Sequence, residues 1–381
     1  MKVKLGGYIQ EYSVRNKANE DIPVYSVTNT QGFCQDYFGK EVASKDKSTY
    51  KIVPRGYFAY NPSRINVGSV DWQRDEDQVI VSPLYNVFSV SPELNQQYLY
   101  YYLKSDFALH RIKAVATGSV RDNLKLEMLK NFPIRIPSVE EQEYIVQALD
   151  KAKNIIDLRR NELQKFDDLI RARFVEMFGD PVSNPYKLPT VLLGELSELI
   201  TKGASPSWQG FNYTDDPSQT LFLTSENVKN GYIDLSSPKY IEDKFNTKQK
   251  RSIVHKGDFL INIVGASIGR AAQFNLNCKA NMNQAAALVR INDNRIRDKY
   301  LLTYLNSDKA QLMYDSMKSD TGRANLSLKD ISELSILLPS IEEQLIFEKV
   351  VAQIDKSKAT VQKALDETQL LFDSLMQQYF G

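Results

Sequence analysis

The side chains that most often bind metals or act as nucleophiles are few and widely separated in this 381-residue chain. Its only histidines are His110 and His255, and its only cysteines are Cys34 and Cys278. Such spacing predicts no His/Cys metal site, although it leaves an all-carboxylate site open. Two isolated cysteines also suit a reducing compartment and form no disulfide framework.

Catalytic and phosphate-binding motifs are missing as well. The nearest match to a P-loop is Gly265–Arg270, GASIGR, which lacks the lysine and has the wrong spacing. Asn61–Arg64, NPSR, lacks the second proline and the aromatic residue of the amino-methyltransferase motif that stacks on a flipped base. There is no GxSxG, HExxH or kinase motif. We therefore predict a binding protein with no catalytic residue, no metal ligand and no cofactor of its own.

Polar, basic and aromatic residues gather in segments expected to be loops. Because Arg, Lys, Asn and Gln read base edges while Ser, Thr and Lys contact phosphates, these segments favour double-stranded DNA as the partner. A structural role competes at each position, since Asn and Ser in loops are commonly turn formers. The candidate DNA contacts are Arg15, Lys17, Asn29, Asn61, Arg64, Asn66, Lys202, Ser207, Trp208, Asn227, Lys229, Ser267, Arg270 and Asn283.

A long stretch of sequence occurs twice, 202 residues apart. Gly118–Gln142 reads GSVRDNLKLEMLKNFPIRIPSVEEQ, and Thr321–Gln344 reads TGRANLSLKDISELSILLPSIEEQ. The match extends to the helices before both stretches and to the Phe-Gly pairs after them, so a long unit is duplicated in tandem. Four further candidate DNA contacts are the paired residues Arg121, Arg323, Asn123 and Asn325.

Each copy continues into a long helix that begins at a capping box. Ser138 with Glu141, and Ser340 with Glu343, have the spacing in which the hydroxyl and the carboxylate satisfy each other's backbone N–H groups. Apolar residues, which include Leu371 in the second helix, then follow a 3.5-residue period that is interrupted by Arg159 in the first helix. This period predicts a coiled-coil seam between the two helices. An amphipathic helix packed on its own globular part remains the alternative.

Before each long helix, short alternating apolar runs and a helix, near 95–116 or 297–318, predict a mixed α/β globular part. The expected class is α+β, with two tandem domains separated by two long helices. These domains hold a basic excess and the helical segments an acidic one, although the whole chain carries only +1. The predicted boundaries are 1–136, 137–180, 181–338 and 339–381.

These features together resemble the DNA-specificity subunit of type I restriction–modification systems. The resemblance rests on the duplicated PSxEEQ helix starts, the lead-ins before them, the LDKAK and IDKSK stretches, RFVEMFGDP at Arg173–Pro181 and LMQQYFG at Leu375–Gly381. It covers essentially the whole chain. One departure is that LDKAK and IDKSK lie 205 residues apart and not 202, which puts an exact internal two-fold in doubt.

The resemblance implies a non-catalytic subunit. Each globular part would be a target-recognition domain that reads one half of a bipartite, asymmetric DNA site. The helices would form an antiparallel coiled coil with pseudo-two-fold symmetry, set the spacing and dock two methyltransferase subunits that use S-adenosylmethionine. Two motor-endonuclease subunits that use ATP with Mg²⁺ would join them, in the cytoplasm of a bacterium or archaeon. Gln142 and Gln344, for which the local sequence offers no explanation, are predicted subunit contacts.

Two other functions stay open at this stage. A self-sufficient DNA methyltransferase or nuclease would transfer methyl groups or cleave without partners, and a stand-alone DNA-binding regulator would bind its site alone. The sequence has no run of about 18 apolar residues, so no membrane span is expected. It does not specify the recognised bases or the spacer length.

Overall fold

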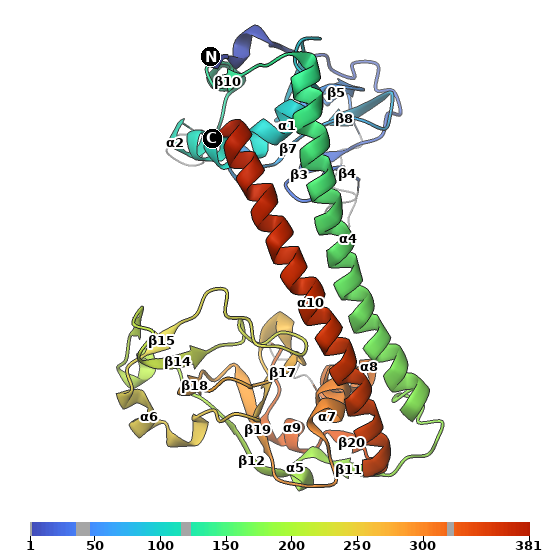
Figure 1. The fold of residues 1–381 in the computed structure, drawn as a ribbon, viewed down its shortest axis with the longest axis vertical. Helices are drawn as coiled ribbons and strands as arrows, with labels where there is room; N and C mark the ends of the chain where they lie inside the picture. Colours follow the sequence, from blue (N-terminus) through green and yellow to red (C-terminus); the bar gives the residue numbers. More distant parts are fainter. Residues whose placement is uncertain (1, 36–45, 116–122, 318–323) are drawn as a thin grey trace. The chain divides into compact units, whose positions relative to one another are not determined.

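The computed structural model forms two compact units, which are described separately (Figure 1). Unit 1 contains residues 1–161 and 362–381, and unit 2 contains residues 162–361. Each unit holds one globular part and portions of both long helices, α4 (Val139–Phe178) and α10 (Ile341–Phe380). The structure describes residues 2–35, 46–115, 123–317 and 324–381.

Unit 1 is built on an inner antiparallel sheet with the strand order β2–β9–β6–β7. Phe58, Phe88 and Tyr98 belong to one core that the sheet shares with its helices, and β1 pairs with β10 beside it. The elements are β1 (Lys2–Lys4), η1 (Leu5–Gly7), β2 (Ile9–Glu11), β6 (Phe58–Tyr60), η2 (Ile65–Val67), β7 (Val70–Trp72), β9 (Asn86–Val90), α1 (Gln96–Lys104), α2 (Asp106–Val115), α3 (Leu126–Lys130) and β10 (Pro133–Arg135).

A smaller core lies on the other face of this sheet. Ala59 and Val87 belong to it, whereas their strand neighbours Phe58 and Phe88 belong to the first core, because successive side chains of a strand point to opposite faces. Two separate strand pairs, β3–β4 and β5–β8, complete this outer part. Their bounds are β3 (Ser26–Thr28), β4 (Gly32–Cys34), β5 (Lys51–Pro54) and β8 (Gln78–Val81).

Unit 2 repeats the inner sheet, with the matching strand order β12–β19–β16–β17. A strand pair, β11–β20, accompanies it, and α7, α8 and α9 follow in the order of α1, α2 and α3 of unit 1, while α5 stands where unit 1 has η1. The elements are β11 (Thr190–Leu192), α5 (Leu193–Leu196), β12 (Ser197–Lys202), β16 (Phe259–Asn262), η5 (Gly265–Ser267), β17 (Ala271–Gln273), β19 (Ala286–Ile291), α7 (Asp298–Leu305), α8 (Asp308–Met317), α9 (Leu328–Ser332) and β20 (Ser335–Leu337).

The outer part of unit 2 has a different design. It is one four-stranded sheet in the order β13–β15–β14–β18, in which β14 and β18 run parallel. Within this unit, β17 and β19 of the inner sheet lie between α10 and this outer sheet (Figure 1). Its elements are η3 (Ser207–Gln209), β13 (Tyr213–Thr214), β14 (Thr220–Leu223), β15 (Tyr240–Ile241), α6 (Lys244–Lys248), η4 (Lys250–Ser252) and β18 (Ala280–Met282).

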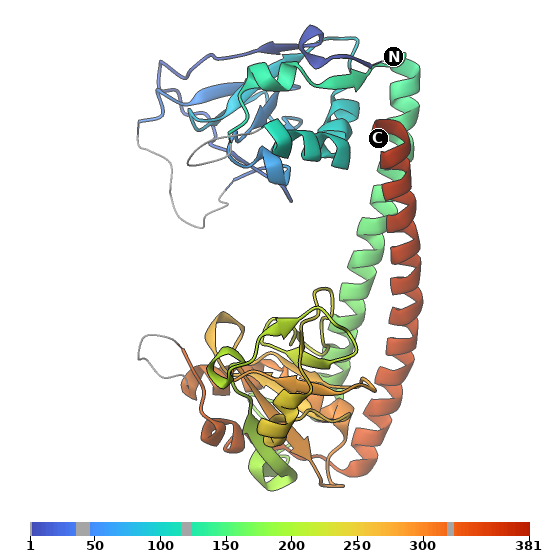
Figure 2. The ribbon, with the colours of Figure 1, turned by 90° about the vertical axis from the view of Figure 1, so that its left-hand side faces the viewer.

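Within each unit the portions of α4 and α10 lie side by side (Figure 1 and Figure 2) and run antiparallel. In unit 1 the end of α10 packs on α1, with the rings of Phe380 and Tyr98 centred 5.1 Å apart. In unit 2 the end of α4 packs on α7, with Phe178 and Tyr300 centred 4.9 Å apart. Each helix therefore starts on the globular part that precedes it and ends on the other one.

Paired tyrosines tie each first helix to the strand that leads into the long helix. Tyr98 donates a hydrogen bond to the backbone carbonyl of Arg135 at 2.8 Å, and Tyr300 donates to that of Leu337 at 2.8 Å. Tyr102 and Tyr304 repeat the arrangement one turn later. Burial raises the pKa of Tyr98 to about 12, so these hydroxyls remain donors at neutral pH.

The predicted class, two α+β domains with two long antiparallel helices, is confirmed, but three details differ. The single helix expected near 95–116 is broken at Ser105, whose hydroxyl accepts from the Ala108 N–H and caps α2. The capping box of α10 is complete, whereas in α4 the carboxylate of Glu141 pairs with Arg135. Leu371, expected in the helix seam, is 55% exposed.

Candidate nucleic-acid interface

One loop of unit 1, between β6 and β7, gathers several candidate DNA contacts. Buried Leu124 donates its backbone N–H to the carbonyl of Pro62 at 3.1 Å, which fixes the neighbouring Asn123 beside this loop. Arg64 and Asn123 are exposed, and Arg64 has no ion pair among the described residues. Asn61 and Asn66 are partly buried, and Asn61 accepts a hydrogen bond from the backbone of Ser63. The loop therefore presents one free cation and several amides.

The loop between β16 and β17 is the equivalent in unit 2. Buried Leu326 donates to the carbonyl of Ile263 at 2.9 Å, so exposed Asn325 lies beside this loop as Asn123 does in unit 1. Arg270 is exposed and has no ion pair in the described part of the chain. The hydroxyl of Ser267 accepts from the Asn262 amide at 3.1 Å, which orders the loop.

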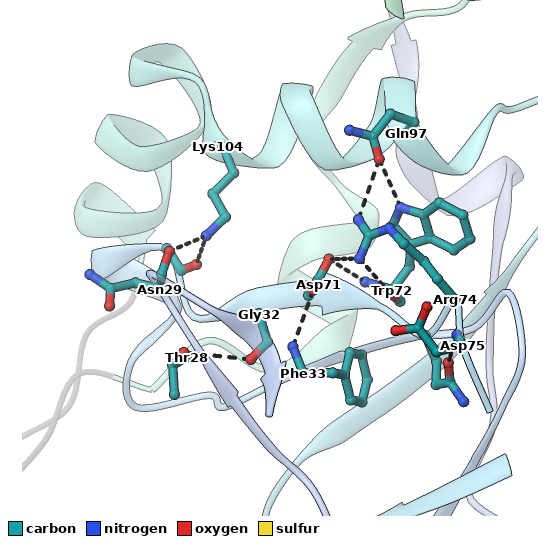
Figure 3. Close-up of polar contacts among 12 residues, drawn as sticks. Thr28, Asn29, Gly32, Phe33, Asp71, Trp72, Arg74, Asp75, Gln97 and Lys104 are labelled. Carbon is teal, nitrogen blue, oxygen red and sulfur yellow. Dashed lines mark hydrogen bonds and ion pairs between the residues drawn. The ribbon is translucent and has the colours of Figure 1, made fainter. Parts of the chain in front are cut away.

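A half-buried polar cluster joins Asn29 to the Arg64 loop in unit 1 (Figure 3). Lys104 on α1 donates its ammonium group to the carbonyl of Asn29 at 3.0 Å and also to the carbonyl of Gly68. Burial lowers the pKa of Lys104 to about 8. The backbone of the β3–β4 turn is thereby held beside the loop, while the side chain of Asn29 is exposed.

Asp71 on β7 anchors the same cluster. Its carboxylate accepts from the backbone N–H groups of Phe33 at 3.2 Å and Trp72 at 2.9 Å, and it pairs with Arg74 at 2.9 Å. Gln97 accepts from the Trp72 indole at 3.1 Å and from Arg74 at 3.3 Å (Figure 3). Because the bonds of Lys104, Asp71, Arg74 and Gln97 link three segments of the protein, this cluster positions the outer strands. No local pattern in the sequence predicts this cluster, since its members come from three distant segments.

Arg15 and Lys17 lie in the loop before β3 and are both exposed. The backbone of Arg15 bridges to Lys51 of β5, which fixes the position of this loop on the outer strands. Among the described residues, no hydrogen bond or ion pair links either side chain to the Arg64 loop. Their exposure keeps both as candidate contacts.

In unit 2, Lys202 leads into an exposed loop that also carries Ser207 and Trp208. Gly203 donates its N–H to the carbonyl of Asn283 at 3.2 Å, and a Cβ added at Gly203 would lie 1.7 Å from the carbonyl oxygen of Met282. Only glycine permits this close approach. The structure thus brings Lys202 and Asn283 together, although they are 81 positions apart.

The structure does not support the predicted role of Asn227 as a base-reading residue, because its side chain is buried. It is 7% exposed, its amide oxygen accepts from the backbone of Thr224 at 2.9 Å, and its amide nitrogen donates to the carbonyl of Asp234 at 2.9 Å. Lys229 is partly buried and lies 3.6 Å from the carboxylate of Asp234. Both side chains order the turn after β14, which is the turn-forming role that competed with base reading.

Gln142 and Gln344 are also not surface contacts, because both side chains have no exposed area. Gln142 accepts from the N–H of Asn95 at 2.8 Å and donates to the carbonyls of Glu93 at 2.9 Å and Pro137 at 3.0 Å. Gln344 makes the same three bonds, at the same distances, to Arg297, Arg295 and Pro339. We call this arrangement the glutamine clamp, since it fastens the start of each long helix to the loop before the first helix.

Arg121 and Arg323 lie outside the described residues. One set of candidate contacts was missed: Lys244, Lys248, Lys250 and Arg251 are all exposed. They occur within KFNTKQKR, which has four cations and no acid in eight residues, so charge patterning could have identified it.

Within the described ranges, His, Cys, Asp and Glu side chains form no group of three that could hold a metal ion. In the same ranges, no helix has the length and hydropathy needed to cross a membrane.

A family model described as "Type I restriction modification DNA specificity domain" matches residues 2–166 and 189–368. The EcoBI type I restriction enzyme specificity subunit of Escherichia coli is 24% identical, over 90% of this chain and 78% of its own length. The putative MjaX specificity subunit of Methanocaldococcus jannaschii is 21% identical, over 85% of this chain and 79% of its own length.

Two solved structures share the fold over the whole chain. One, titled "Structural basis underlying complex assembly and conformational transition of the type I R-M system", has a TM-score of 0.56 and 20% identity, and the match covers 97% of its length. The other, the S subunit of a type I restriction–modification system from M. genitalium, has a TM-score of 0.54 and 16% identity, and 96% of its length is covered.

Proposed function

The chain belongs to the type I restriction–modification DNA-specificity family, and we propose that its two units each contact one half of a divided DNA site. As a member of this family it is a DNA-specificity subunit of a type I restriction–modification system. We propose that methylation and cleavage belong to partner subunits and that this chain supplies the recognition. A cytoplasmic location is part of the same proposal.

The observation that carries this proposal is the contrast between repeated and unrepeated parts. The inner sheets have the same strand order and the clamps the same three hydrogen bonds, whereas the outer parts have different sheets. Residues that are identical in both units cannot distinguish two different half-sites. Base contacts therefore fall to positions where the units differ, such as Arg64 with Asn66 in unit 1 and Arg270 with Trp208 in unit 2.

The repeated pairs have a different proposed role. Arg121 with Arg323, and Asn123 with Asn325, would contact backbone phosphate or support the loops. Replacing Arg121 by alanine should weaken modification uniformly and leave the modified sequence unchanged. A changed recognition sequence in that variant would contradict this assignment.

The long helices are the proposed docking surface for the modification subunits. In unit 1 they expose large apolar side chains, including Tyr144 at 66%, Leu158 at 67% and Leu370 at 71%. Exposed apolar groups on otherwise polar helices are typical of protein contacts. Two modification subunits would bring S-adenosylmethionine, and two motor-endonuclease subunits would bring ATP with Mg²⁺.

The deciding experiment is a map of adenine methylation across the host genome with and without this gene. A divided motif that disappears on deletion and returns on complementation supports the proposal and identifies both half-sites. An unchanged methylation map would contradict it. Methyl transfer by the purified chain alone would favour a self-sufficient methyltransferase, and tight specific binding without any methyltransferase partner would favour a regulator.

A further inference from the structure

Trp208 in unit 2 is unusually placed for a tryptophan. Its side chain is 87% exposed, more than any other large apolar side chain in the part of the chain that the structure describes. The chain has only one other tryptophan, Trp72, whose indole donates to Gln97 and lies under the Arg74 guanidinium. An indole is costly to leave in water, so its exposure on an ordered turn indicates a contact with a partner.

The turn that carries Trp208 is held by its neighbours. Pro206 is buried, and its carbonyl accepts from the N–H groups of Gln209 at 2.9 Å and Phe211 at 3.0 Å. The ring of Phe211 packs on buried Phe245, with centroids 5.4 Å apart. An aromatic side chain presented from such a turn loses little conformational entropy on binding.

A group of cations surrounds this turn. Lys248 donates to the carbonyl of Gln209 at 3.0 Å, and η4 packs against β12, which ends at Lys202. We define the basic cluster as Lys202, Lys244, Lys248, Lys250 and Arg251, all of which are exposed. Among the described residues none of the five forms an ion pair, and neither 202–211 nor 244–251 contains an acidic residue.

A buried network fixes the segment that carries most of these cations. Asn281 is fully buried and donates to the side chain of Asn246 at 2.8 Å and to the carbonyl of Gln249 at 3.2 Å. Its amide oxygen accepts from the Ser252 hydroxyl at 2.8 Å. Because every polar group of Asn281 is satisfied, α6 and η4 are held in one position relative to the outer sheet.

Unpaired cations around an exposed aromatic ring fit nucleic acid better than any other partner. The cations match a row of phosphates, and the indole has a large apolar face but only one hydrogen-bond donor, which suits stacking and not base-edge reading. We propose that Trp208 stacks on bases at one step of the half-site contacted by unit 2, while the basic cluster holds the flanking phosphates. This inference rests on the proposed function and adds a local unstacking of the DNA.

The described globular part of unit 1 has no counterpart of this exposed aromatic side chain. In residues 2–35, 46–115 and 123–138 no aromatic side chain is among the exposed large apolar groups. On the described residues, the inference therefore places the DNA distortion in the half-site that unit 2 contacts. This asymmetry makes the inference testable within a single DNA duplex.

The test uses the full chain assembled with its modification subunits and a duplex that contains its mapped methylation site. 2-Aminopurine replaces one base at a time, at positions other than the methylated adenine, in both half-sites. A fluorescence change at one step of one half-site is expected for the wild type and for Trp208→Phe, and its loss is expected for Trp208→Ala. Trp208→Ala should also bind the site roughly 5- to 150-fold more weakly, as expected for the loss of one base–aromatic stack.

Tyr186→Ala is the matched control, because Tyr186 is 58% exposed but lies in the connection between α4 and β11. It should leave both signals unchanged.

Trp208→Ala with affinity within twofold of the wild type and an unaltered fluorescence scan would overturn the inference and leave the proposed function standing. Weaker assembly with the modification subunits at unchanged DNA affinity would overturn it in favour of a protein contact. A wild-type complex that does not prefer its site over a scrambled duplex would overturn both.

Discussion

Unit 1 and unit 2 repeat each other where the globular part meets the helices and diverge in their outer parts. The glutamine clamps have the same three hydrogen bonds at 2.8, 2.9 and 3.0 Å, whereas the outer part is two strand pairs in unit 1 and one four-stranded sheet in unit 2. The repeated region fixes how a domain is attached, and the diverged region is free to differ in what it contacts. A residue's role can therefore be inferred from which region holds it.

One contact shows how the repeat tolerates divergence at the junction itself. Gln97 donates to Asp150 at 3.4 Å in unit 1, and its counterpart Lys299 pairs with Asp355 at 2.6 Å in unit 2. Gln97 and Lys299 lie 202 positions apart, whereas Asp150 and Asp355 lie 205 positions apart. The lysine side chain is longer than that of glutamine, so Lys299 can reach a carboxylate about one turn further along the long helix α10. The two acids thus have the same 205-residue offset as the LDKAK and IDKSK stretches that contain them.

The largest effect is expected for a feature that only unit 2 has. Asp258 is 2% exposed and accepts two hydrogen bonds of 2.8 Å from Arg290 on β19. The position on β9 of unit 1 that corresponds to Arg290 is Ser89, which cannot form this ion pair. Asp258→Ala leaves the partly buried guanidinium without a partner, so it should lower the free energy of unfolding by about 3 kcal/mol. Urea denaturation measures this loss.

The control for this prediction is Asp293→Ala, which removes the partner of exposed Arg295. Surface pairs contribute little, so its unfolding midpoint should stay close to that of the wild type. Equal losses of unfolding free energy in Asp258→Ala and Asp293→Ala would show that the buried ion pair stabilises unit 2 no more than the exposed pair does.

A smaller and equal loss in both units is expected from the glutamine clamp. Gln142→Leu and Gln344→Leu each remove three hydrogen bonds from a buried site and should each lower the free energy of unfolding by about 2 kcal/mol. Gln353→Leu, at an exposed position of α10, is the matched control and should have no comparable effect. A large loss from only one of the two clamp variants would contradict their equivalence.

Substitutions of the two exposed arginines should show which half of the DNA site each unit contacts. Arg64→Ala and Arg270→Ala should each weaken DNA binding by about 1–2 kcal/mol and relax the methylated motif in one half-site only, a different half-site for each variant. Methylation mapping measures the motif, and titration at two salt concentrations measures affinity. Uniform weakening with an intact motif would reassign both residues to phosphate contacts.

The smallest expected effect is a pH dependence confined to unit 1. Burial lowers the pKa of Lys104 to about 8, so the unfolded chain binds more protons than the folded one between about pH 8 and 10. Stability from this group should therefore rise with pH through that window. Because the ammonium group is partly exposed and solvent screens it, the rise should be only about 1 kcal/mol, well below the full value of the shift. In unit 2 the equivalent position is Asn306, which does not titrate and whose amide bonds to the backbone of Ala271.

Unfolding of unit 1 can be followed through Trp72 in a Trp208→Phe background, where it is the only tryptophan. The difference between this protein and its Lys104→Met variant should grow in favour of lysine from pH 8 to 10. Comparing the two proteins cancels the other titrating groups. A constant difference across the window would show that the ammonium group stays charged in the folded state.

Much of the architecture could be predicted from the sequence because it depends on local rules and on the repeat. The 202-residue offset, the caps at Ser138 and Ser340 and the apolar period of the helices predicted two α+β domains and two long helices, all of which the structure has. Seam residues were less certain, since Leu371 has the right spacing and yet lies outside. Packing against a particular neighbour, and not the period alone, selects the buried face.

The candidate site was predicted less well. Exposure of Arg64, Arg270 and Trp208 follows from the polar loops that carry them. The grouping of Arg64 with Asn123, and of Arg270 with Asn325, follows from the conformation of the folded loops. Asn227 has the residue type of a base reader, but its amide oxygen and its amide nitrogen both bond within a turn. A side chain's type gives what it can bind, while its neighbours determine whether it is free to do so.

The sequence by itself determined the duplicated plan, the helix starts and the family, because these are written as spacings along the chain. Only the tertiary structure decided that Gln142 and Gln344 are internal, since their partners lie 47 to 49 positions away or in the backbone just before the helix. It also decided that Trp208 is presented among the basic cluster, because the loop after β12 and the segment α6–η4 meet only once the outer sheet has formed. Long-range hydrogen bonds and burial carry that information, and no local pattern encodes them.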